Sequence, residues 1–506
     1  MTERGKKILL IEPPVIIRHG EFHQCMPPLG LSYIASYIRK HGYTVEILDA
    51  CVEGWDKRAG FKKGWDFKGL TKDEIKKRIA EYGPDIIGIS WKFTRQETAF
   101  SLTLEAAREA AKDAVVVIGG AHPSSNPDGV LGKYGVDYIV LGEGEEIFKN
   151  LITALTAKKD VSRIEGLAFK VNGKVVKNEK VSYIQTLDSL PYPARDLLPM
   201  DKYSSDNRAN SFEGDVREYP KTTIITSRGC PEKCTFCAIK GIWGRKYRVR
   251  SAENVVGEIE ELVNRYGIRD IHFLDDNLTL DKDRAARIFD LVIERGIKFH
   301  WRTPNGVSSK TLDPGLIAKM KESGCYRLSL GIESGNARIL NEVIKKNLDF
   351  EKLKQVNKWI KEAGLEREGF FILGMPGEDS DTIMDTINLA MELDLDSAAF
   401  FSAQPFPGTE LFKLCSEKGY IKTSGAEYLM TSNPSVDTPF LSKGELKQWQ
   451  RIANYSMALK KNGGGMIRLK YHVSRMLLGL YKIKRRLTVE SSTYLRPLLP
   501  GQGWRQ

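Results

Sequence analysis

Three cysteines stand close together in the segment Cys230-Pro-Glu-Lys-Cys234-Thr-Phe-Cys237. Clustered thiolates are typical of a metal centre. Three of them bind three irons of a [4Fe–4S] cubane and leave the fourth iron open to a small chelating ligand. The alternative is zinc, which in a structural site takes four protein ligands, but the next cysteine or histidine along the chain is His272. The spacing therefore favours an iron–sulfur cluster with one open iron.

Length and composition limit the class of protein. The chain has 506 residues, of which 41% are hydrophobic and 28% charged, as in globular proteins of two or three domains. No apolar run reaches the ~18–20 residues that span a bilayer. The first run, Lys7–Ile11, is too short for a signal peptide, and the seven cysteines are an odd number. We expect a cytoplasmic protein in which the cysteines outside the cluster are small buried side chains: Cys25, Cys51, Cys325 and Cys415.

The positive charge is concentrated near the C-terminus. The net charge is +12, and the segment 446–489 has eleven lysines and arginines and no acidic residue. Because the rest of the chain is close to neutral, we expect no nucleic-acid partner. Within 426–506, expected to be mainly helical, one apolar stripe recurs at helical spacing: Leu469, Val473, Met476, Leu480, Ile483 and Leu487. Such a basic helix lies on an anionic membrane surface, here the inner face, or packs on the protein with its basic face in solvent.

Six apolar strands alternate with amphipathic helices between residues 216 and 425. This α/β series predicts a parallel sheet, most simply a partial (β/α)6 barrel, in which function lies at the carboxyl ends of the strands. The cysteines follow the first predicted strand, Thr222–Thr226. Polar and glycine-containing segments follow the other five strands: Leu274–Leu278, Pro304–Gly306, Gly331–Gly335, Gly374–Glu378 and Gln404–Gly408.

Residues ~220–410 resemble the radical S-adenosylmethionine (SAM) superfamily, whose signature is C-x3-C-x2-C with an aromatic residue before the last cysteine, here Phe236. The resemblance implies that SAM chelates the open iron. An electron from a donor such as ferredoxin or flavodoxin then cleaves SAM to methionine and a 5′-deoxyadenosyl radical. Asp275 or Asp276 would accept hydrogen bonds from the SAM amino group, although the usual Gly-Gly-Glu is absent. Asn305 would also bind SAM, and Glu333 would bind its polar groups or a ribose hydroxyl.

Residues 1–155 predict a second α/β unit, a doubly wound, flavodoxin-like domain of five strands. It resembles the cobalamin-binding domain that precedes many radical SAM modules, on the segments Met26–Leu31, Ser90 and Gly119–Pro123. The resemblance implies that Ser90, Gly119 and Gly120 contact the cobalamin, with His122 as a further candidate. The usual D-x-H-x-x-G signature has Pro27 in place of its histidine, so a bound cobalamin would lack that axial ligand.

A connector over residues 156–215 is predicted to contain a hairpin about Asn172-Gly173, formed by Ala168–Val175 and Val181–Ile184. Three functions remain open. The pair of domains favours a cobalamin-dependent radical SAM methyltransferase that acts on an unactivated carbon of a small or lipid-like molecule. An anaerobic oxidative cyclase, as in the related porphyrin cyclases, would use the same cofactors. A non-catalytic cobalamin or cluster sensor is the alternative of another class.

Overall fold

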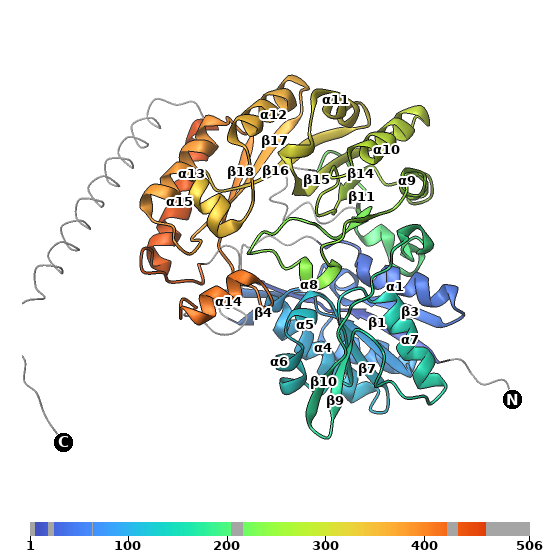
Figure 1. Cartoon of the computed structure of the whole chain (residues 1–506). Helices are drawn as coiled ribbons and strands as arrows, with labels where there is room; N and C mark the ends of the chain where they lie inside the picture. The colour runs from blue at the N-terminus through green and yellow to red at the C-terminus, as the bar shows by residue number, and fades with distance from the viewer. Residues whose placement is uncertain (1–5, 19–24, 63, 204–215, 422–433, 462–506) are drawn as a thin grey trace, which may run out of the picture.

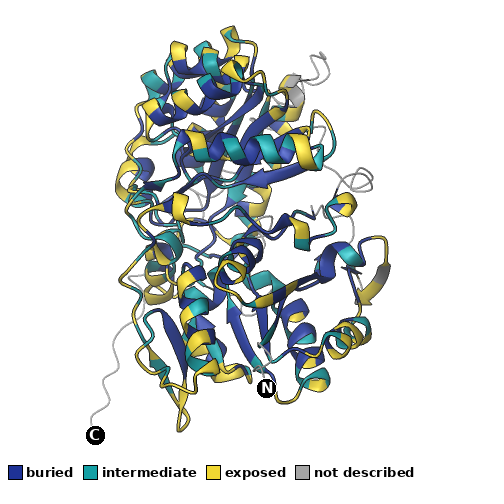
Figure 2. Ribbon diagram, turned by 90° about the vertical axis from the view of Figure 1, so that its right-hand side faces the viewer, coloured by how far each residue is buried: buried dark blue, intermediate teal, exposed yellow. Residues whose placement is uncertain are grey.

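The computed structural model describes residues 6–18, 25–62, 64–203, 216–421 and 434–461. Figure 1 shows two α/β domains, one above the other, with the short helix α8 (Lys240–Trp243) between them. In both domains most strands are buried and the outer sides of the helices are exposed (Figure 2). The apolar stripe that begins at Leu469 lies outside the described residues.

The N-terminal domain has the predicted flavodoxin-like topology. Its parallel strands lie in the order β8-β7-β6-β1-β3, the 2-1-3-4-5 order of that fold. Near-continuous Ile, Leu and Val runs form these strands because helices cover both faces of the sheet. The strands are β1 (Lys7–Glu12), β3 (Thr44–Asp49), β6 (Ile86–Ser90), β7 (Val115–Gly119) and β8 (Tyr138–Val140).

Two hydrophobic clusters cover the two faces of this sheet. Helices α1 (Leu29–Lys40) and α7 (Glu145–Thr156) pack on one face. The other face is covered by α3 (Lys72–Tyr82), α4 (Glu97–Ala110) and α6 (Pro127–Lys133). The remaining helices of this domain are short: α2 (Ala50–Glu53) and α5 (Ala121–Ser125).

The predicted hairpin is partly wrong. Its turn is at Asn172-Gly173, but the strands are β9 (Leu167–Val171) and β10 (Lys174–Lys177), and Val181–Ile184 is not a strand. Strand β9 pairs antiparallel with β8, so the hairpin extends the N-terminal sheet and is not a separate connector. A small antiparallel sheet that the sequence analysis missed comprises β2 (Val15–Arg18), β5 (Trp65–Lys68) and β4 (Arg58–Lys62).

The second domain is the predicted open barrel. Its six strands are parallel and neighbours in chain order, and the two outer strands do not pair with each other. The strands are β11 (Lys221–Ile224), β14 (Asp270–Phe273), β15 (His300–Val307), β16 (Cys325–Glu333), β17 (Glu366–Leu373) and β18 (Ser397–Ser402). The first strand leads into a ribbon of β12 (Ser227–Arg228) and β13 (Arg248–Val249), which frames the cysteine segment and α8.

Helices cover the outer face of the barrel, and side-chain caps set where most of them begin. Ser251, Asp281, Asp313 and Asp349 each accept a backbone N–H in the first turn of the next helix. The covering helices are α9 (Ala252–Tyr266), α10 (Lys282–Glu294), α11 (Pro314–Glu322), α12 (Phe350–Glu362), α13 (Ser380–Glu392) and α15 (Lys443–Lys461). Helix α14 (Glu410–Glu417) instead lies beside the cysteine loop, where the Leu411 N–H donates to the Thr235 carbonyl at 2.9 Å. The segment that follows β16 forms a π-helix, Ile339–Ile344.

Candidate cofactor sites

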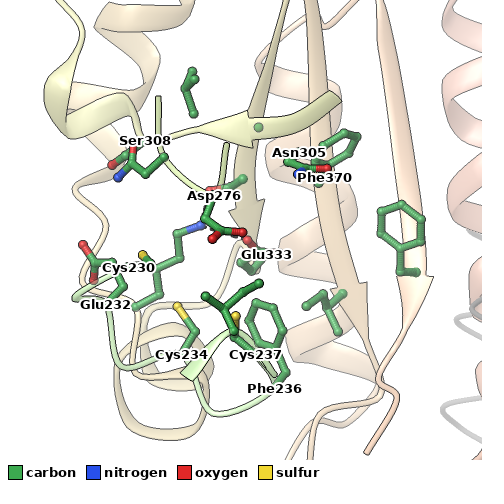
Figure 3. Close-up of a pocket in the computed structure, with 18 of the residues that line it drawn as sticks. Cys230, Glu232, Cys234, Phe236, Cys237, Asp276, Asn305, Ser308, Glu333 and Phe370 are labelled. Atoms are coloured by element: carbon green, nitrogen blue, oxygen red, sulfur yellow. Dashed lines mark hydrogen bonds and ion pairs between the residues drawn. The ribbon is translucent and has the colours of Figure 1, made fainter. Parts of the chain in front are cut away.

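The three clustered cysteines lie at the carboxyl mouth of the barrel and line a cavity of about 340 Å³. Figure 3 shows their sulfur atoms in this cavity. Thr235 fixes the loop on the barrel: its N–H donates to the Ile344 carbonyl at 3.0 Å, and its hydroxyl donates to the Val343 carbonyl at 2.8 Å. Burial raises the pKa of Cys234 to about 12 and that of Cys237 to about 11, so an iron cluster would have to supply the charge that stabilises the thiolates.

The donor set fits a cluster with one open iron. Within the described ranges, no fourth cysteine and no histidine lines this cavity. The other four cysteines are buried and unpaired, as predicted. The Sγ atoms of Cys25 and Cys51 are 3.4 Å apart, which is a thiol hydrogen bond and not a disulfide.

The two adjacent aspartates have different surroundings. Asp275 is buried and accepts hydrogen bonds from the Thr226 backbone N–H at 3.2 Å, the Thr226 hydroxyl at 2.7 Å and the Ser227 hydroxyl. Asp276 lines the cavity beside the cysteines. Burial and the charge of Asp275 raise the pKa of Asp276 to about 7. Asp275 therefore stabilises the end of β11, and Asp276 is the carboxylate that faces the cavity.

Glu333 also lines the cavity and is held by a lysine that the sequence analysis missed. The Lys346 ammonium is 2.8 Å from a Glu333 carboxylate oxygen and 2.7 Å from the Gly331 carbonyl. Both side chains are largely buried, at 15% and 11% exposure. Glu333 has φ +69, a strained conformation for a residue other than glycine. No sequence pattern marks Lys346, because it reaches the cavity from the loop after the π-helix.

The wall of the cavity opposite the cysteines is apolar. Phe370 and Phe401 meet edge to face with ring centroids 5.9 Å apart. Phe406 and Ile372 extend this wall, and Gln404 adds a polar group. Asn305 lines the same cavity and donates a hydrogen bond to the Leu274 carbonyl at 2.8 Å, which ties β15 to the end of β14. Such a wall can pack against an adenine ring or another flat apolar group and exclude water from it.

A second cavity, of about 360 Å³, lies at the carboxyl edge of the N-terminal sheet. Ser90, Gly119 and Gly120, the residues expected to contact cobalamin, all line it. Gly120 has φ +117, and a Cβ there would lie 2.5 Å from the Trp91 carbonyl oxygen, so only glycine fits this turn. Most of the other lining side chains are apolar, for example Leu10 and Phe148. Such a lining suits a long and mostly neutral ligand.

His122 does not line this cavity. Its Nδ1 lies 2.7 Å from the Thr94 hydroxyl, and its ring centroid is 4.3 Å from that of Trp91. Burial lowers the pKa of His122 to about 4, so the ring is neutral. Among the residues that the structure describes, no histidine lines the second cavity. His122 is therefore not placed to contact a ligand in this cavity.

Helix α8 separates the two cavities. Ile239, just before this helix, lines the cysteine cavity, whereas Ile242 and Trp243 line the cavity of the N-terminal domain. A flavodoxin-like domain with a glycine-lined cavity therefore lies directly against a barrel that carries three cysteines at its mouth. This fold and site define a radical SAM enzyme with a cobalamin-binding domain.

Comparison with known proteins identifies the family. A model of the radical SAM superfamily matches residues 224–390, and a model of the B12 binding domain matches residues 16–152. A cytidylyl-2-hydroxyethylphosphonate methyltransferase of Streptomyces wedmorensis is 34% identical over 88% of this chain and 88% of its own length. An uncharacterised methyltransferase of Pyrococcus horikoshii is 33% identical over 90% and 93%. The chain belongs to the cobalamin-dependent radical SAM methyltransferase family, and it is an enzyme.

More distant relatives include cyclases. An anaerobic magnesium-protoporphyrin IX monomethyl ester cyclase of Rubrivivax gelatinosus is 27% identical over 87% of this chain and 75% of its own. Among solved structures, the methyltransferase TsrM of Kitasatospora setae, with cobalamin and a [4Fe–4S] cluster bound, matches with a TM-score of 0.66 at 20% identity, covering 88% and 81% of the two chains. OxsB, with aqua-cobalamin and SAM bound, matches at 0.71 and 17%, covering 94% and 71%. Both show the same fold.

In the described parts of the chain, no helix is long and apolar enough to cross a membrane.

Proposed function

We propose that this enzyme methylates an unactivated carbon of a small molecule, with SAM as the methyl source. The observation that carries the proposal is the position of the two cavities on either side of α8, one lined by the three cysteines and the other by the glycines of the N-terminal domain. When bound, the cluster supplies the electron that cleaves SAM, and cobalamin carries the methyl group.

The residues of the barrel mouth bind and orient these groups. Cys230, Cys234 and Cys237 ligate the cluster, and Asp276 accepts hydrogen bonds from the SAM amino group. Lys346 neutralises Glu333 and fixes its carboxylate, whose remaining lone pairs accept hydrogen bonds from a ribose hydroxyl. The wall formed by Phe370 and Phe401 excludes water, which protects a reactive radical from side reactions.

The names of the relatives support a proposal for the substrate class. The most similar relative given above is named for a phosphonate linked to a cytidylyl group. We propose a small polar molecule, such as a nucleotide-linked phosphonate, in preference to a lipid. A low-potential flavodoxin or ferredoxin would supply the electrons. Contact of the segment after residue 461 with a membrane stays a prediction.

The test uses SAM whose methyl group is deuterated. The cluster is reconstituted anaerobically, cobalamin and a reductant are added, and the protein is incubated with candidate substrates and small-molecule extracts. We expect 5′-deoxyadenosine and a product that carries the label. A product that forms without the label would support the cyclase function of the more distant relatives instead. A protein that forms no 5′-deoxyadenosine would contradict both.

A further inference from the structure

The loop that carries the cysteines begins and ends at two side chains in contact with each other. Arg228 precedes Cys230 by two residues, and Trp243 follows Cys237 by six. The Arg228 guanidinium carbon lies 4.7 Å from the centroid of the Trp243 ring, a cation–π contact. Both side chains line the second cavity. The base of the cluster loop is therefore part of the wall of the cobalamin cavity.

Two carboxylates of the N-terminal domain hold Arg228. Its guanidinium lies 2.6 Å from Glu145 and 3.3 Å from Glu143, and Arg248, on the paired strand β13, lies 2.6 Å from the same Glu143 oxygen. None of these side chains is more than 5% exposed. Glu143 and Glu145 alternate with Gly142 and Gly144, which also line the second cavity.

Because these charged side chains are buried, the energy of their network depends strongly on the distances between them. Arg228 and Arg248 stand directly opposite each other across the ribbon, and Glu143 lies between their charges. Burial alone would raise the pKa of Glu145, but the Arg228 charge outweighs it and lowers the pKa. Because ion pairs are weakly screened away from water, a small displacement of Arg228 changes the energy of the whole network.

Arg228 transmits such a displacement to the cysteines through a short and tight backbone. Gly229, between Arg228 and Cys230, has φ +85, and a Cβ there would lie 2.3 Å from the Lys246 carbonyl oxygen. The Gly229 backbone thus packs directly on that of Lys246, and this single residue joins Arg228 to Cys230. The position of the Arg228 side chain and that of Cys230 are thus linked.

We propose that Arg228, with Trp243, is a positioning residue that couples the cobalamin site to the cluster site. A ligand in the second cavity fixes both side chains and so fixes the loop that presents the three cysteines. By linkage, each cofactor raises the affinity of the protein for the other by the same factor. The inference rests on cobalamin binding in the second cavity. It gives Arg228 and Trp243 a role in addition to lining that cavity, because they would link it to the cluster site.

The test measures the dissociation constant of hydroxocobalamin by absorbance titration of the full chain, before and after anaerobic reconstitution of the cluster. The wild-type protein is expected to bind cobalamin about 5- to 150-fold more tightly when the cluster is present, the usual range of coupling between two sites. Arg228→Gln should reduce this ratio towards one, and Arg228→Lys, which keeps the charge, should restore part of it. Trp243→Leu tests the same coupling without unpairing a buried charge, in case Arg228→Gln does not fold.

The control is Arg367→Gln, which removes another buried guanidinium, paired with Asp396 at the start of β17. This variant is expected to unfold more easily but to keep the wild-type ratio. Equal cobalamin affinities with and without the cluster in the wild-type protein, or an unchanged ratio in both Arg228→Gln and Trp243→Leu, would overturn the coupling. A wild-type protein that binds no cobalamin in either state would instead contradict the assignment of the second cavity.

Discussion

Asp275 and Asp276 are adjacent carboxylates that point into different surroundings. Asp275 accepts three hydrogen bonds from Thr226 and Ser227 in the interior, while Asp276 faces the cavity beside Cys230 (Figure 3). Two residues with the same side chain therefore have separable roles. One stabilises the first strand, and the other is available to a ligand.

Substitution of the two aspartates should separate stability from SAM binding. Asp276→Asn is expected to weaken SAM binding by roughly 10- to 100-fold, as for the loss of a charge-assisted hydrogen bond. It should not lower the free energy of unfolding, because the raised pKa of Asp276 means that its charged form already costs stability. Asp275→Ala unpairs three buried donors and should lower the free energy of unfolding by about 3 kcal/mol. Isothermal titration and urea unfolding measure the two effects. A loss of SAM affinity in Asp275→Ala alone would show that the roles are reversed.

The raised pKa of Asp276 predicts a pH dependence of SAM binding. Burial and the charge of Asp275 raise this pKa to about 7, so the accepting carboxylate is protonated below that pH. The affinity of the reconstituted protein for SAM should fall as the pH decreases through about 7 and level off above it. The Asp276→Asn variant should lack this dependence. The same pH profile in wild type and variant would assign the titration to another group.

The cluster assignment is tested by removal of one thiol. Cys234→Ala should abolish the absorbance of the reconstituted protein at about 400 nm, which arises from thiolate-ligated iron, and all SAM cleavage. Cys415→Ala is the matched control because this cysteine is buried in the hydrophobic core of the barrel and lines neither cavity. A variant without Cys234 that still forms 5′-deoxyadenosine would refute the assignment.

Gly30 offers a way to block the cobalamin cavity without a change in the fold. It lines the second cavity at the start of α1, and a Cβ there meets nothing within 4 Å. Gly30→Phe should fold normally and fill part of the cavity, so that cobalamin no longer remains bound after gel filtration. Gly30→Ala, with a smaller side chain, should still retain it. Cobalamin retained by Gly30→Phe would place the ligand elsewhere.

His122 should be dispensable for cobalamin. Its ring is held by Thr94 and packs on Trp91, outside the cavity. We expect His122→Gln to bind cobalamin with an unchanged absorbance spectrum, because no axial nitrogen is lost. A shift of the spectrum in this variant would show that the histidine reaches the cobalt.

The sequence predicts the elements with strong local signals. The barrel strands are apolar runs, and helices such as Ala252–Tyr266 begin at a capping residue, so both domains could be recognised. The turn at Asn172-Gly173 is a local signal, but the sequence does not show that the hairpin belongs to the N-terminal sheet, because the pairing of β9 with β8 is a contact between distant segments. Lys346 and the Arg228 network could not be predicted for the same reason. Their partners, Glu333 and Glu143, lie on other elements, and only the folded chain brings them together.

The central claim is that the cluster and cobalamin act together in methyl transfer, and it can be tested without the substrate. The reconstituted protein is incubated anaerobically with cobalamin, a reductant and SAM that has a deuterated methyl group, and the corrinoid is then extracted for mass spectrometry. The account predicts that the label appears on the corrinoid in wild type and is absent in Gly30→Phe, which keeps its cluster. An unlabelled corrinoid in a wild-type protein that binds cobalamin and cleaves SAM would contradict the account.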